Sequence, residues 1–136
     1  MRKSTIILVT LVTLLATSLL SACKQASSSI LEETVKEMQK ECPMHVDDGI
    51  RVDNVYTEGN QMVIEYRFDD LNADDIQALA DDPDAKQMFL DGFTSGDTSE
   101  EKVFLTILKE SGYDVRCDLI GGLGGRASFT VDNANL

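Results

Sequence analysis

The fold is decided by residues 50–68, which read IRVDNVYTEGNQMVIEYRF. In the second half of this stretch, apolar side chains at positions 62, 64, 66 and 68 alternate with Val63, Glu65 and Arg67. Alternation with a period of two is typical of a β-strand that buries one face. Glu58-Gly59-Asn60 separates this run from residues 50–56 and has the composition of a turn. The stretch therefore predicts a β-hairpin with one buried face.

A second hairpin is predicted near the end of the chain. Tyr113, Val115, Cys117 and Leu119 alternate with polar residues, and the alternation resumes at positions 127, 129 and 131. Between them lies the glycine-rich run at residues 121–125, which lacks the Gly-Lys-Ser/Thr ending of a phosphate-binding loop. We therefore interpret this run as a turn between two strands.

Helical spacing and capping residues predict the remaining elements. A capping box of Ser29 and Glu32 opens a helix over residues 30–42, and Asn72 caps a short helix that runs through residue 79. Asp82 before a proline begins another helix, which stops near Gly92. A second capping-box pattern, Asp97 and Glu100, begins the last helix, which ends at Gly112.

The element order α-ββ-αα-α-ββ indicates an α+β fold. It predicts an antiparallel sheet of about four strands in two hairpins, with helices packed on one face. Residues 30–136 are long enough for one such domain.

The N-terminal residues have the features of a secretory signal. Met1-Arg2-Lys3 is positively charged, residues 6–20 are apolar, and small Ser21 and Ala22 follow. An uncleaved transmembrane helix is the alternative, but the apolar run is short for a span of about 20 residues. Residues 1–22 are therefore interpreted as a signal peptide.

The tetrad Leu20-Ser21-Ala22-Cys23 resembles the lipobox of bacterial lipoproteins. The resemblance implies that Cys23 is diacylated and becomes the mature N-terminus, and two acyl chains give stable anchoring. Residues 23–29 are then expected to form a polar tether. Lys24 is not the aspartate that retains lipoproteins at the inner membrane, so the resemblance favours the outer membrane, and we expect the periplasmic leaflet.

The chain is strongly acidic. It carries 12 basic and 24 acidic residues, a formal net charge of −12. Loss of Arg2 and Lys3 with the leader leaves 10 basic residues and a charge of −14. Such a field repels nucleic acid and favours a basic protein partner, although a solvated acidic surface is the simpler explanation of the composition.

Cys42 and Cys117 remain once Cys23 is assigned to lipid. Both lie at inward positions of their predicted elements, and export exposes them to an oxidising compartment. We expect a structural disulfide between them. Neither belongs to a Cys-x-x-Cys pair, so a redox-catalytic role is disfavoured.

Metal binding and catalysis find little support in the sequence. Cys42-Pro43-Met44-His45 contains three ligand types, but the spacing matches no known metal motif. The dense aspartates of residues 69–84 lack the pattern of a calcium loop and are better explained as helix caps. His45 is the only histidine, and no nucleophile elbow is present. We expect no enzyme, metal or cofactor.

The stretch ECPMHVDDGI at residues 41–50, with the hairpin that follows it, resembles small lipoproteins of unknown function from Bacteroidales and their relatives. In that family a leading helix ends in Cys-Pro, and an acidic, glycine-containing link precedes a hairpin rich in Tyr and Val. The similarity covers residues 30–68 well and implies a Gram-negative envelope, with no assigned chemistry.

Three functions follow as hypotheses. The first is a non-enzymatic envelope lipoprotein that binds a protein, with Tyr56 and Glu58 near a hairpin end as the expected contacts. The second is an inhibitor of basic enzymes such as lysozymes, or of β-lactamases by architecture alone. The third is a carrier of a metal or small ligand.

Overall fold

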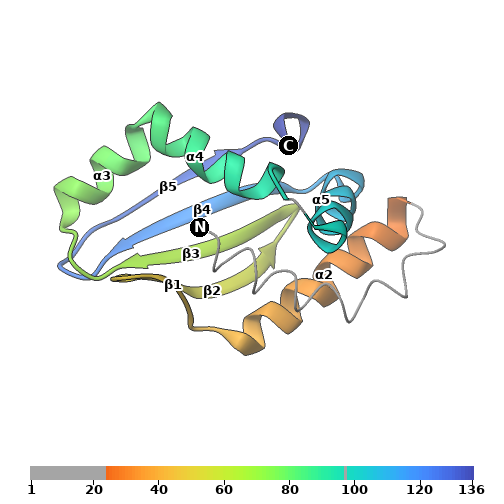
Figure 1. Ribbon diagram of the computed structural model, residues 1–136, viewed down its shortest axis with the longest axis horizontal. Helices are drawn as coiled ribbons and strands as arrows, with labels where there is room; N and C mark the ends of the chain where they lie inside the picture. The colour runs from red at the N-terminus through yellow and green to blue at the C-terminus, as the bar shows by residue number, and fades with distance from the viewer. Residues whose placement is uncertain (1–23, 97) are drawn as a thin grey trace.

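The computed structural model describes residues 24–96 and 98–136. Runs of strands and runs of helices follow one another in a mixed α+β arrangement, which confirms the predicted fold class (Figure 1). The elements in chain order are α2 (Lys24–Glu41), β1 (Met44–Asp47), β2 (Ile50–Glu58), β3 (Gln61–Phe68), α3 (Ala73–Asp81), α4 (Pro83–Thr94), α5 (Ser99–Ser111), β4 (Asp114–Gly121), β5 (Arg126–Val131) and the 3-10 helix η2 (Asn133–Asn135).

The sheet has five strands in the order β1-β2-β3-β4-β5. Both predicted hairpins are present, but β3 and β4 are parallel, so the expectation of a purely antiparallel, four-stranded sheet was wrong. The reason is that α3, α4 and α5 form one crossover that returns the chain to the end of the sheet where β3 began. Alternation identifies strands but does not reveal which way two hairpins join.

The fifth strand, β1, escaped the sequence analysis because it is only four residues long. Met44 and Val46 on this strand are buried, whereas His45 and Asp47 are exposed. The pairing with β2 shifts register between His45 and Asp47, and the turn passes through Gly49 at φ 71°. Two buried side chains are too short a pattern to distinguish a strand from a loop.

The first helix begins at Lys24, so residues 24–29 are helical and the expectation of a polar tether was wrong for them. Cys23 lies outside the described residues. Ser27 is completely buried, and its hydroxyl donates a hydrogen bond of 3.1 Å to a carboxylate oxygen of Glu110 on α5. This contact with a distant helix extends α2 toward the N-terminus, beyond the Ser29 capping box that local sequence favours.

Carboxylate and amide caps begin the central helices, as predicted. Asn72 and Asp75 form a capping box at α3, and the Asp82 side chain accepts the Asp84 amide at the start of α4. The cap of α5 is Thr98; the predicted cap Asp97 lies outside the described residues. Gly112 ends α5 in the left-handed conformation at φ 75°. Helix capping therefore accounts for many of the aspartates.

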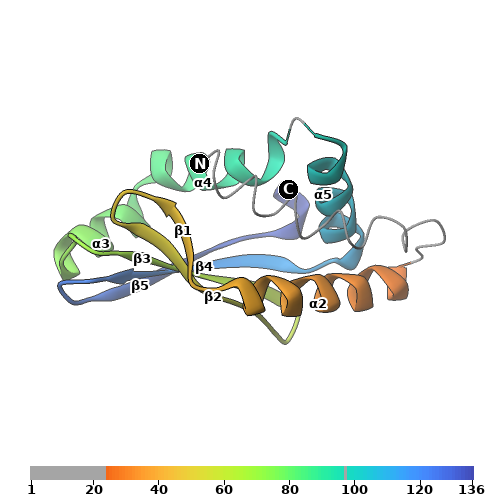
Figure 2. The ribbon, with the colours of Figure 1, turned by 60° about the horizontal axis from the view of Figure 1, so that its bottom comes forward.

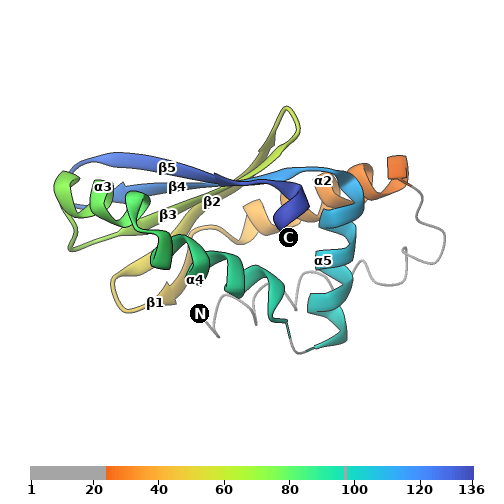
Figure 3. The ribbon, with the colours of Figure 1, turned by 90° about the horizontal axis from the view of Figure 1, so that it is seen from above.

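As expected, α3, α4 and α5 lie on one face of the sheet (Figure 3), and α2 runs along the side of the sheet formed by β2 (Figure 2). At one end α2 and α5 pack against each other, and α2 also packs against β2. At the other end Phe89 of α4 stacks between Tyr66 and Phe129, with ring centroids 5.1 and 5.4 Å apart. These aromatic rings extend the hydrophobic core across the covered face.

The glycine-rich run is a turn, as predicted, and it packs closely against the link between β3 and α3. The Gly122 amide donates to the Phe68 carbonyl over 2.7 Å, and the Leu123 amide donates to the Leu71 carbonyl over 3.0 Å. A Cβ atom on Gly121 or Gly122 would collide with backbone atoms of this link. The glycines are therefore required by close backbone approach.

Candidate functional site

The face of the sheet opposite the helices carries a network of arginines and carboxylates. The register places Arg116 beside Val63 and Asp118 beside Glu65 on this face, which we call the open face. All four arginines after residue 23 make their ion pairs here: Arg51, Arg67, Arg116 and Arg126. Alternation along each strand separates these side chains from the apolar residues under the helices.

Asp118 is the centre of the network. Its side chain is only 6% exposed, and its two oxygens accept hydrogen bonds of 3.1 Å from Arg116 and Arg126. Arg126 also lies 2.8 Å from Glu65. The hydrogen bond to Asp118, followed by the one to Glu65, raises the pKa of Arg126. Every polar atom of this buried carboxylate is thus paired.

Tyr56 and Glu58, the predicted partner contacts, meet at the same arginine. The Arg116 guanidinium donates to the Tyr56 hydroxyl oxygen over 3.2 Å and lies 3.1 Å from a carboxylate oxygen of Glu58. It also donates to Gln61 over 3.3 Å. The structure therefore brings both residues together on the open face, and contact with a partner stays a prediction.

The far end of the open face is also ion-paired. Asp53 is the additional residue of a bulge in β2, and its carboxylate lies 2.7 Å from Arg51 and 3.9 Å from Arg67. Asp69 lies 3.8 Å from Arg51. Four arginines thus face five carboxylates, so this surface is nearly neutral on a strongly acidic chain. Fixed, mutually paired charges are suited to recognising a surface rather than to proton transfer.

Cys42 and Cys117 are free thiols, so the expected disulfide is absent from the structure. The sulfur of Cys42 lies 3.4 Å from the Met38 carbonyl, and α2 packs against β2. Cys117 is on β4, which β3 separates from β2. Two strand spacings of about 4.8 Å exceed the Cα separation that a disulfide allows. Cys117 lies in the core and Cys42 packs against it, but the structure leaves the two thiols unpaired.

The side chains of the Cys42-Pro43-Met44-His45 stretch do not converge. Met44 is buried in the core, and His45 is exposed on the other side of β1. Within residues 24–96 and 98–136, no group of three or more His, Cys, Asp or Glu side chains is arranged to hold a metal ion. None of the helices described is long and apolar enough to cross a membrane.

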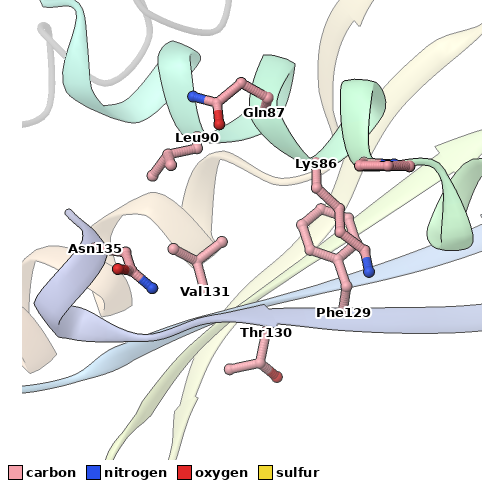
Figure 4. Close-up of a pocket in the computed structure, with 8 residues that line it drawn as sticks. Lys86, Gln87, Leu90, Phe129, Thr130, Val131 and Asn135 are labelled. Carbon is pink, nitrogen blue, oxygen red and sulfur yellow. The ribbon is translucent and has the colours of Figure 1, made fainter.

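A groove between α4 and β5 was missed by the sequence analysis. It has a volume of about 430 Å³, and Figure 4 shows Leu90 and Val131 facing each other across it. The residues that line it are Pro83, Lys86, Gln87, Leu90, Phe129, Thr130, Val131 and Asn135. The spacing 83, 86, 87, 90 marks one side of a helix, which was the available signal. That β5 lies at a sheet edge was not evident from sequence.

No family model matches the chain, and no curated protein matches its sequence. Among solved structures, a Pseudomonas aeruginosa protein classed as secreted matches with a TM-score of 0.56 and 18% identity, over 85% of this chain and 97% of that one.

Two type II secretion system pilotins also match. EpsS of Vibrio vulnificus has a TM-score of 0.52 and 11% identity, over 82% of this chain and 93% of its own. AspS of Vibrio cholerae has the same score and identity, over 83% of this chain and 94% of its own. At these identities the likeness concerns the fold. It extends over almost the whole of each pilotin chain.

Removing the charge of Asp118 should destabilise the protein. We expect Asp118→Asn to lower the free energy of unfolding by about 1–3 kcal/mol, because Arg116 and Arg126 lose a buried charged partner. Asp69→Asn is the matched control. The ion pair of Asp69 with Arg51 is long and about half exposed, so this variant should lose less than about 1 kcal/mol of its free energy of unfolding. Urea unfolding of both variants checks this, and equal losses would contradict a central role for Asp118.

The two thiols should differ in reactivity. Cys42 is partly exposed, whereas Cys117 is completely buried and burial raises its pKa to about 12. We expect Cys42 in the folded chain to be alkylated at least about tenfold faster, as followed by peptide mass analysis. Burial also raises the pKa of Cys42 above its ordinary range, so its alkylation rate should still increase with pH where an exposed thiol has already ionised. A Cys42–Cys117 bond in a non-reducing mass measurement would contradict the structure.

Proposed function

We propose that the protein is a lipid-anchored, non-enzymatic binding protein of the Gram-negative envelope and acts as an accessory to a secretion assembly, as a pilotin does. The observation that carries the proposal is the fold likeness to two pilotins, which covers 93% and 94% of their chains. The likeness to a protein classed as secreted supports an exported location. The matched share of this chain, 82–85%, is about the size of the domain that follows residues 1–22.

The N-terminal sequence supports the anchor. The tetrad at residues 20–23 has the lipobox pattern, and α2 begins at Lys24, the next residue. Because α2 packs along α5 and β2, an anchor at Cys23 would be joined to the folded domain with almost no intervening chain. Such a domain would be held at the surface of the membrane, where a secretion assembly passes through the envelope.

The open face supports binding as the mode of action. Arg116 holds Tyr56 and Glu58 in fixed positions at the end of the β2–β3 hairpin, so they can contact a partner with little loss of side-chain freedom. The surrounding charge of −14 attracts a basic partner over a distance that salt screens. The expected partner is therefore a protein with a basic contact surface.

Replacing Cys23 by alanine tests the anchor. In a host that processes lipoproteins, we expect the wild-type chain in the membrane pellet and Cys23→Ala in the soluble fraction, because the thiol that receives the acyl chains is lost. Cys42→Ala is the matched control and should remain in the pellet. If Cys23→Ala also stays in the pellet, the lipid anchor is wrong.

Capture of the partner from native envelopes tests the binding role. We expect Glu58→Ala to reduce capture several-fold and Asp48→Ala to leave it nearly unchanged. Both remove one negative charge, but Glu58 bonds Arg116 on the open face while Asp48 lies in the β1–β2 turn. Association should slow as salt rises. Equal effects of the two variants would reject the open face, and recovery of a lysozyme or β-lactamase would favour the inhibitor hypothesis instead.

A further inference from the structure

The two edges of the sheet differ in how well they are protected. β1, at one edge, has four residues and a register shift between His45 and Asp47. β5, at the other edge, has six residues, pairs with β4 without a shift and contains no proline. Short strands, bulges and prolines are the usual devices that prevent a sheet edge from pairing with another chain. β5 has none of these devices.

The outward-pointing backbone groups of β5 can be assigned from the turn. The Gly121 amide donates to the Gly125 carbonyl over 3.0 Å, which makes this pair a hydrogen-bonded one. Bonded and non-bonded pairs alternate along an antiparallel ladder. The amide and carbonyl groups of Arg126, Ser128 and Thr130 therefore point away from β4, toward the outer edge. Among the hydrogen bonds of the described residues, none satisfies the outward amides of Ser128 and Thr130.

The groove under α4 lies along this same edge. Phe129 and Val131 form its floor and Leu90 its opposite wall, as Figure 4 shows. An additional strand beside β5 would direct every second side chain into the groove. Its volume of about 430 Å³ falls in the range of natural binding pockets. Unpaired backbone groups and an apolar groove thus occur together at one place.

The charges around the groove indicate the kind of partner. Gln87 lines the groove and its amide donates to the Asp91 carboxylate over 2.8 Å, so Asp91 is in contact with a lining residue. Asp84 adjoins Pro83 at one end, and Asp132 follows Val131 at the other. Lys86 is the cation among the lining residues. A second copy of this acidic chain would be repelled, whereas an extended segment with basic ends would be attracted.

We infer that the outer edge of β5, roofed by α4, binds an extended segment of a partner protein as a sixth strand. The segment carries apolar side chains at alternate positions, which enter the groove, and lysine or arginine at its ends. Main-chain hydrogen bonds to Ser128 and Thr130 supply affinity, and the groove supplies specificity. This site is separate from the open-face contacts and does not depend on the anchor at Cys23.

A labelled peptide, KKVTVTVKK, tests the site with the full chain in non-ionic detergent, by fluorescence anisotropy. We expect KKVTVTVKK to bind, and both EEVTVTVEE and KKVTPTVKK to bind at least about tenfold more weakly. The proline peptide has the same charge but cannot form the strand, so it separates pairing from simple electrostatic attraction. Equal binding of KKVTPTVKK, or no binding of KKVTVTVKK, overturns the inference.

Two pairs of protein variants locate the peptide. Thr130→Pro removes an outward amide without removing a hydrogen bond to β4, and it should weaken peptide binding at least about tenfold. Thr130→Val keeps the amide, so its affinity for the peptide should stay within about twofold of the wild-type affinity. Leu90→Gln should weaken binding, whereas Met88→Gln should not, because exposed Met88 lies outside the groove. Urea unfolding verifies that each variant is folded. The inference is overturned if Thr130→Pro binds the peptide as tightly as the wild-type chain does. It is also overturned if the wild-type chain forms a dimer and Thr130→Pro dissociates it.

Discussion

The parallel pairing of β3 with β4 is the constraint on which the rest of the structure depends. It places Met62 beside Val115 and Ile64 beside Cys117 on the face that the helices cover. The same register places Glu65 beside Asp118 on the open face, within reach of Arg126. A slip of one residue would exchange the two faces and bury the ion pairs under the helices. The crossover through α3, α4 and α5 is what allows this pairing.

The two faces of the sheet also carry different kinds of side chain. The thiol of Cys117 lies in the core, where burial keeps it protonated, and His45 is isolated on β1. The arginines of the sheet and most of its carboxylates neutralise one another on the open face. Such a surface offers fixed hydrogen-bonding groups to a protein partner.

The acidic charge is unevenly distributed. The open face is nearly neutral because it contains all the arginines after residue 23, so most of the negative charge belongs to the helices and loops. Asp82 and Asp84 stabilise the N-terminus of α4, and both adjoin Pro83 at one end of the groove beside β5. Capping and attraction of a basic segment are therefore compatible uses of the same residues. Neither use requires a bound metal.

The sequence by itself determined four of the five strands, the two hairpins, the central helix caps and the glycine turn, because each depends on residues close together in the chain. Alternation at positions 62–68 and the cap at Asn72 are local signals of this kind. It also placed Tyr56 and Glu58 at a hairpin end. Only the tertiary structure decided the direction of β4, the helical start of α2, the separation of Cys42 from Cys117 and the free edge at β5. Each of these depends on contacts between distant segments, such as Ser27 with Glu110, which no local pattern encodes.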